Sequence, residues 1–138
     1  MRMANEAIHR VRYPIPTVND ISIDLNGAEY FSKLNLAQAY HQQPLEEDSR
    51  YITSFRTHVG LFRYKRLAYG VNASADIFQH ALHKNQQGIP RIRKIADHIF
   101  VYATTREEHE ATLQNCLQRL RVKGLTLNPK TLRKHAVF

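Results

Sequence analysis

The sequence predicts an α+β fold in which helices cover one face of an antiparallel sheet. Short runs of β-branched and aromatic residues occur in pairs around tight turns, which is typical of hairpins. Longer segments between these pairs carry apolar residues at intervals of three and four, which is typical of amphipathic helices. Strands that alternate with helices but are joined largely by hairpins favour one antiparallel sheet with helices packed on it.

The first predicted helix follows a proline-rich segment near the N-terminus. Two prolines in residues 13–16 force that segment to be extended. Thr17 and Asp20 have the spacing of a helix N-cap pair, and Gly27 supplies the stop. We therefore expect a short amphipathic helix between them.

Four stretches then have strand character. Residues 30–36 are predicted to form a strand, and residues 41–45 a second extended piece whose proline favours a sheet edge. Residues 51–55 and 61–64 flank a turn that contains Gly60, so they predict a hairpin.

Two longer helices are expected in the second half of the chain. Ser74 opens the first, which ends at residues 88–90. Thr105 and Glu108 have capping-box spacing, and the apolar residues after them recur on one helical face until Gly124. A short strand is expected at residues 125–127.

Residues 93–102 form the stretch around which the other elements are organised. Two apolar runs flank a polar pair, Asp97 and His98, which predicts a hairpin with that pair at its tip. A carboxylate on such a tip, backed by buried strands, is held rigidly toward a cleft.

Net charge indicates an acidic partner. The chain of 138 residues has 20 Lys and Arg against 12 Asp and Glu, a formal charge of +8. Nucleic acid is the first candidate partner and an anionic membrane surface the second. A third interpretation of this charge is a basic surface that binds neither nucleic acid nor a membrane.

Other classes of protein are disfavoured. Cys116 is the only cysteine, which excludes an intramolecular disulfide and a cysteine-rich zinc site. No stretch approaches the roughly 18 apolar residues of a membrane span, and no signal-peptide pattern begins the sequence. We therefore expect an intracellular protein, cytoplasmic or nuclear, that does not act in a membrane. Asp76, His80 and His83 share a helical face that suits either a metal ion or solvent.

Several short blocks resemble the reverse transcriptase domain of gypsy-type LTR retrotransposons, and they occur in the family's order. The blocks are Tyr13-Pro14-Ile15-Pro16, residues 30–36, 39–42, 62–67, 69–73, 78–79, 95–98, 107–109 and 124–130. The resemblance implies a polymerase palm sheet and nucleotidyl transfer by Mg²⁺ held between aspartates.

Carried over to this sequence, the metal-binding positions are Asn35, Asp97 and His98. Only Asp97 keeps a carboxylate. An asparagine offers a neutral oxygen, and a histidine offers a nitrogen that suits zinc or nickel better than Mg²⁺. The resemblance thus implies a reverse transcriptase by ancestry in which Mg²⁺ binding is lost or weak and catalysis is lost.

The same resemblance gives candidate binding residues. Tyr40, Tyr69, Gly70 and Gln79 match positions around the incoming nucleotide, although Tyr40 suits a core position equally well. The candidate nucleic-acid contacts are basic: Arg63, Lys65, Arg66, Lys130, Arg133 and Lys134. A template–primer of RNA or DNA is the implied partner.

We interpret residues 1–138 as one reverse-transcriptase-like domain fragment. Residues 1–30 are the end of the fingers and a connecting helix, residues 31–130 are the palm, and residues 131–138 are a divergent basic tail. Upstream fingers strands, a thumb and an RNase H region are not matched. Alternatives to an inactive polymerase are a nucleic-acid-binding or regulatory module that reuses the basic cleft, and a relic without a function.

Overall fold

The computed structural model describes residues 2–131 and 133–136. Its helices and strands follow one another in this order: α1 (Arg2–Ala7), α2 (Val18–Asp24), β1 (Tyr30–Asn35), η1 (Ala39–Gln42), η2 (Glu47–Thr53), β2 (Phe55–Thr57), β3 (Gly60–Phe62), α3 (Ser74–Asn85), β4 (Ile92–Ile95), β5 (His98–Ala103), α4 (Arg106–Val122), η3 (Pro129–Thr131) and β6 (Arg133–Ala136). The η elements are short 3-10 helices.

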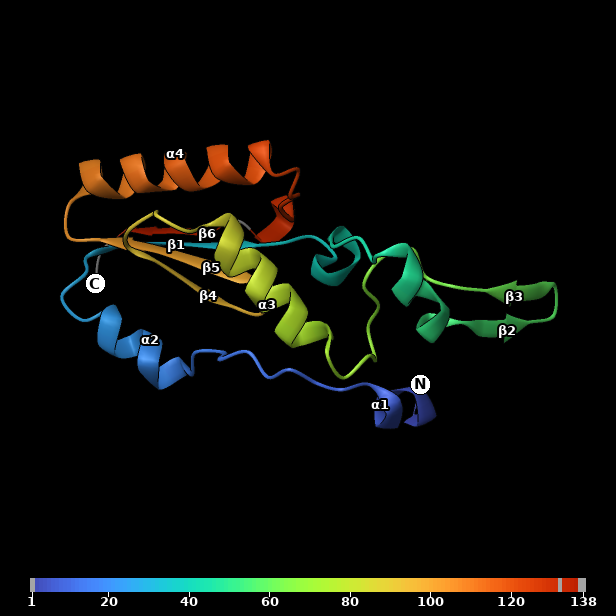
Figure 1. Ribbon diagram of the computed structural model, residues 1–138. Coiled ribbons are helices and arrows are strands. Elements are labelled where there is room, and N and C mark those ends of the chain that lie inside the picture. Colours follow the sequence, from blue (N-terminus) through green and yellow to red (C-terminus); the bar gives the residue numbers. More distant parts are fainter. Residues whose placement is uncertain (1, 132, 137–138) are drawn as a thin grey trace.

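The main sheet has four strands in the order β4-β5-β1-β6 (Figure 1). Every pairing is antiparallel. β1 lies between β5 and β6, and its register with β5 pairs Tyr30 with Ala103 at one end and Asn35 with His98 at the other. The antiparallel sheet predicted from the hairpin patterns is therefore confirmed.

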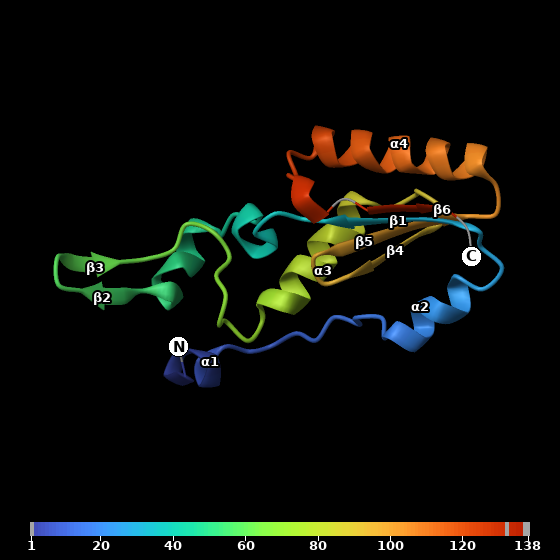
Figure 2. The ribbon, with the colours of Figure 1, turned by 180° about the vertical axis from the view of Figure 1, so that it is seen from behind.

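Both long helices pack on the same face of this sheet (Figure 2). One core cluster unites the two helices with the buried side chains of the strands: Leu34, Leu36, Ala39, Leu67, Phe78, Leu82, Ile92, Ile99, Val101, Leu113, Cys116 and Leu120. Alternate residues of β5 are buried, as expected for a strand with one covered face. The structure thus confirms an α+β fold with its principal helices on one side.

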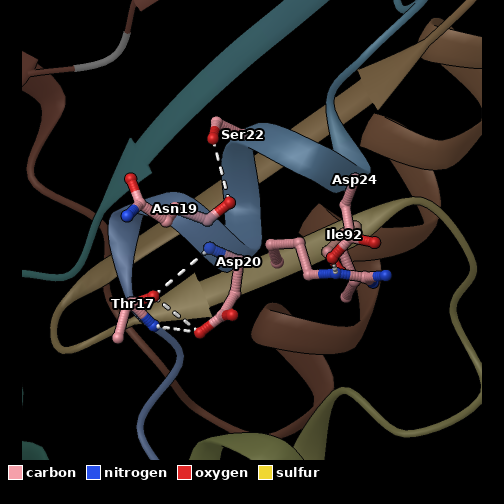
Figure 3. Close-up of polar contacts among 7 residues, drawn as sticks. Thr17, Asn19, Asp20, Ser22, Asp24 and Ile92 are labelled. Carbon is pink, nitrogen blue, oxygen red and sulfur yellow. Dashed lines mark hydrogen bonds and ion pairs between the residues drawn. The ribbon is translucent and has the colours of Figure 1, made fainter.

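The short α2 lies near the opposite face and is tied to the sheet by an ion pair. Thr17 and Asp20 form a reciprocal capping box at its start, as the sequence predicts (Figure 3). At the end of α2, Asp24 Oδ2 accepts a hydrogen bond from Arg93 Nε of β4 at 2.6 Å. This contact fixes the connection between the proline-rich segment and β1.

The hairpin of β2 and β3 projects away from the main sheet (Figure 1). It is shorter than the predicted hairpin, because residues 47–53 form η2 instead of entering the strand. Its apolar side chains remain exposed, with 74% of Leu61 accessible. None of the helices among the described residues has the length and hydropathy needed to cross a membrane.

Two further local predictions need correction. Residues 41–45 do not form a strand, because η1 continues to Gln42 and only Pro44 makes an isolated bridge. Residues 125–127 likewise contribute a single bridge, between Leu127 and Leu36. Within the predicted basic tail, residues 133–136 form β6, whose backbone pairs with β1.

Candidate catalytic corner and nucleic-acid interface

Asn35, Asp97 and His98 come together where β1 ends and β4 turns into β5. The hairpin turn consists of Ala96 and Asp97, and His98 is the first residue of β5. The predicted tip is therefore displaced by one residue. Ala96 has a φ of 50°, the left-handed conformation that such two-residue turns require. This tight turn brings the Asp97 backbone next to Leu36, whose N–H donates to the Asp97 carbonyl at 2.9 Å.

The His98 imidazole stands between the other two side chains of this corner. Its Nδ1 lies 2.7 Å from Asn35 Oδ1, and its Nε2 lies 3.6 Å from Asp97 Oδ1. Because an amide oxygen can only accept, Nδ1–H is the donor in the first contact. The Asp97 side chain is 46% exposed, so its carboxylate faces solvent beside the ring.

This donor set does not fit a pair of Mg²⁺ ions. Magnesium prefers anionic oxygen ligands in octahedral geometry. This corner has one carboxylate, that of Asp97, while the Asn35 oxygen already accepts a hydrogen bond and His98 offers a nitrogen. Within residues 2–131 and 133–136, no group of three His, Cys, Asp or Glu side chains is placed to hold a metal ion.

Two of the candidate nucleotide-binding residues pack together. The Tyr40 and Tyr69 rings lie 4.8 Å apart, and Phe78 contacts Tyr40 edge-on at 5.6 Å. Burial raises the pKa of the Tyr40 hydroxyl, and the nearby Tyr69 and Asp97 add to this effect. Tyr40 is thus half-buried against the core, whereas Tyr69 is 56% exposed. Tyr69 is the ring of this pair that offers a free surface.

Gly70 lies in a turn that α1 holds in place. Its φ is 86°, and its carbonyl accepts a hydrogen bond from Asn5 Nδ2 at 2.8 Å. Asn5 also accepts from the Asn72 backbone N–H and receives the Asn72 side chain on its own carbonyl. Asn5 is a positioning residue that the sequence alone did not reveal, because its partners lie more than sixty positions away.

Gln79 is turned toward the sheet. Its side chain is 4% exposed, and its Nε2 donates to the Lys94 carbonyl at 3.0 Å. The preceding residue, Phe78, is the one that contacts Tyr40. The structure therefore joins Gln79 to β4, and its predicted contact with a nucleotide stays a prediction.

Arg63, Lys65 and Arg66 are exposed on the segment that returns from β3 to the core. Aromatic rings lie among them: Tyr64 is 41% exposed, and the His41 ring lies 6.4 Å from Tyr64. His41 also contacts Tyr69 at 5.1 Å, which links this basic segment to the tyrosine pair. Cations beside exposed rings are the composition of surfaces that bind single-stranded nucleic acid.

The remaining basic candidates lie near the C-terminus. Lys130 is exposed, and its backbone N–H donates to Asn128 Oδ1. The backbones of Arg133 and Lys134 pair with β1, but their side chains lie outside the described residues.

The α3 face with Asp76, His80 and His83, for which the sequence allows either a metal ion or solvent, is in contact with the N-terminal segment. Asp76 is 3% exposed, accepts from Arg10 Nε at 2.5 Å and from the Tyr13 N–H at 2.9 Å, and so serves a structural ion pair. Arg10 is the main cause of the lowered pKa of this carboxyl. The His80 ring stacks on Tyr13 at 5.1 Å.

Comparison with known proteins identifies the family of the chain. The profile of the family described as reverse transcriptase (RNA-dependent DNA polymerase) matches residues 1–135. The chain is 30% identical over 131 residues to the retrovirus-related Pol polyprotein from transposon 412 of Drosophila melanogaster, covering 94% of this chain and 11% of the polyprotein. It is 31% identical over 121 residues to the retrovirus-related Pol polyprotein from transposon gypsy of the same organism. This match covers 86% of this chain and 12% of that polyprotein.

The fold is also found among solved structures. A foamy viral protease-reverse transcriptase in complex with an RNA/DNA hybrid superimposes with a TM-score of 0.86 at 23% identity, covering 99% of this chain and 18% of that one. The chain spans about a tenth of the length of the curated relatives it matches. On the profile match and the two polyprotein relatives, this chain belongs to the reverse transcriptase (RNA-dependent DNA polymerase) family.

Proposed function

We propose that this chain is the palm part of a retrotransposon-derived reverse transcriptase that binds nucleic acid but does not transfer nucleotides. The observation that carries the proposal is the pairing of Asn35 with His98 at two of the three carried-over metal positions. Because these two side chains form a hydrogen bond with each other and supply no negative charge, Asp97 is the one carboxylate of the three positions that can attract a cation. Two-metal catalysis needs several anionic ligands to hold both ions between the reacting oxygens.

Binding of nucleic acid is supported by charge and by aromatic surface. The chain carries +8, and Arg63, Lys65 and Arg66 lie beside the exposed rings of Tyr64 and Tyr69. Cations neutralise backbone phosphates, while rings stack on bases without reading their sequence. We therefore expect binding to single strands of RNA or DNA with little sequence preference.

Filter binding and primer extension on one preparation test both halves of the proposal. We expect no Mg²⁺-dependent extension, and binding that weakens about twentyfold to fiftyfold between 50 and 200 mM salt if three or four phosphates are neutralised. Measurable extension would overturn the inactive assignment. Affinity that does not change with salt would overturn the binding mechanism.

A matched pair of triple variants locates the surface. Arg63→Gln, Lys65→Gln and Arg66→Gln together should weaken binding and flatten its salt dependence. Lys84→Gln, Arg121→Gln and Lys123→Gln remove the same charge from exposed positions on or next to α3 and α4. Equal effects of the two sets would show that net charge, and not the segment after β3, governs binding.

A further inference from the structure

A cleft of about 510 Å³ lies away from the Asp97 corner. Its lining residues come from the proline-rich segment between α1 and α2, from α3 and the turn after it, and from the edge strand β4. Figure 1 shows the positions of these elements. Among its lining residues are Tyr13, Pro14, Pro16, Gln86, Ile92 and Lys94. None of the candidate metal-binding positions lines it, so it is a separate feature of the palm.

The outer wall of this cleft is fixed at both ends. At one end the Tyr13 N–H and the Arg10 side chain are bound to the buried carboxylate of Asp76 in α3. At the other end the capping box fixes the start of α2 (Figure 3), and the ion pair of Asp24 with Arg93 joins the end of α2 to β4. The wall is therefore preorganised, and a ligand need not order it on binding.

Buried amide groups without partners line the same cleft. Gln86 is 1% exposed, and neither its Nε2 nor its Oε1 has a hydrogen-bond partner in the described part of the chain. Gln79 Oε1 is also unpartnered, since this side chain uses only its Nε2. Gln79 lies within α3, and Gln86 is the residue that caps its C-terminal end. These atoms are enclosed by the protein. Buried polar atoms left unpaired are costly, and a ligand removes that cost if the two side chains turn toward the cleft and pair with it.

Lys94 adds an ammonium group to the inner wall. It is 9% exposed and forms no ion pair with a described residue. The charge of its neighbour Arg93 is already matched by Asp24, and no Asp or Glu lines the cleft. An anionic group in the cleft would therefore find an unmatched buried cation.

We propose that this cleft binds a small planar heterocycle that carries an amide-like edge and an anionic substituent. A glutamine side chain can donate and accept side by side, as it does toward the edge of a nucleobase. The apolar rings of Tyr13, Pro14 and Pro16 cover the ligand's plane, and Lys94 takes its anion. The volume lies within the usual range for small-molecule sites.

Titration of the isotope-labelled chain with AMP, adenosine and orotate tests this proposal. AMP carries its anion on a ribose, adenosine carries no anion, and orotate carries its anion directly on the ring. We expect AMP or orotate to shift the side-chain amide resonances of Gln79 and Gln86, and adenosine to bind more weakly. If none of the probes shifts these resonances in the folded chain, the proposal is overturned.

Variants separate the two parts of the recognition. Lys94→Met should weaken the binding of AMP and orotate by about tenfold or more and leave the affinity for adenosine unchanged. Gln86→Leu should weaken all three probes. Lys123→Met and Gln118→Leu make the same changes at exposed positions of or next to α4 and should have no effect.

The controls decide how a loss of affinity is read. If Lys123→Met weakens AMP as much as Lys94→Met does, general electrostatic attraction explains the binding and the proposal is overturned. Lys94→Met removes a buried charge and should not impair folding, so it remains informative if Gln86→Leu fails to fold. Nucleic-acid binding and primer extension are measured separately, so a failure of the cleft leaves the proposed function untouched.

Discussion

Asn35 and His98 are direct partners across the β1–β5 ladder, and their side chains form a 2.7 Å hydrogen bond at the end of that ladder. Carboxylates at both positions would repel each other and Asp97 unless a cation lay between them. The amide and the imidazole attract each other instead. This pair therefore needs no cation to offset like charges.

A double-mutant cycle measures this attraction. Asn35→Ala and His98→Ala should each destabilise the fold, and the double variant should lose less than the sum of the two. We expect a coupling of about 0.5–1.5 kcal/mol in the free energy of urea unfolding. Additive losses would show that the two side chains contribute independently.

Asp76 should be the most important carboxylate for stability among the described acidic residues. Asp76→Asn removes the charge that Arg10 faces, so we expect a loss of about 1–3 kcal/mol at neutral pH. Asp48→Asn, at an exposed position, is the control and should change little. Urea unfolding of both variants gives the comparison.

The same variant predicts a pH dependence. The folded-state pKa of Asp76 is lowered, chiefly by Arg10. Its stabilisation is therefore present above the unfolded pKa of about 3.9 and is lost as pH falls through the lower folded value. The gap between wild type and Asp76→Asn should shrink at about pH 3, and a gap of unchanged size there would contradict this assignment.

Lys94 should be destabilising at neutral pH. Burial lowers its pKa from 10.5 to about 8. Between those values the unfolded chain holds the proton and the folded chain does not, so stability rises with pH. A shift of this size corresponds to about 3 kcal/mol, and Lys94→Met should gain about 1–3 kcal/mol at neutral pH. Unfolding at about pH 7 and about pH 9.5 should show that gain shrinking, and a constant gain would rule out the titration.

The β2–β3 hairpin should promote self-association. Phe55, Leu61 and Phe62 are all exposed, and the two phenylalanine rings lie 6.1 Å apart. Leu61→Glu should lower the concentration dependence of sedimentation. Val122→Glu introduces the same charge at a similarly exposed position on α4. Monomeric wild type at high concentration would refute the expectation.

Local signals in the sequence predicted the elements that they themselves stabilise. The capping box at Thr17 and the N-cap at Thr105 mark the starts of α2 and α4, and the apolar runs around residues 96–97 mark the β4–β5 hairpin. Elements that depend on distant partners were missed. α1 has no buried residue and is held through Asn5, while β6 exists as a strand by pairing with β1.

The candidate site was predicted in its composition but not in its contacts. The family resemblance placed Asn35, Asp97 and His98 at one corner, yet a one-residue shift of the turn moved His98 into β5. The position of the turn could not be predicted from Ala96, because alanine is not among the residues typical of left-handed turn positions. The contact of His98 with Asn35, like that of Arg93 with Asp24, joins residues more than sixty positions apart. Sequence spacing carries no signal for such pairs.

The effect of Mg²⁺ on thermal unfolding tests the central claim most directly. Asn35→Asp with His98→Asp would place three carboxylates at the corner, and their repulsion should lower the melting temperature in the absence of metal. Mg²⁺ should then raise it, since a ligand bound only by the folded state stabilises that state. We predict that this rise occurs in the double variant and is absent in wild type. An equal rise in wild type would show that Asn35 and His98 leave the metal site intact, and would contradict the assignment of an inactive corner.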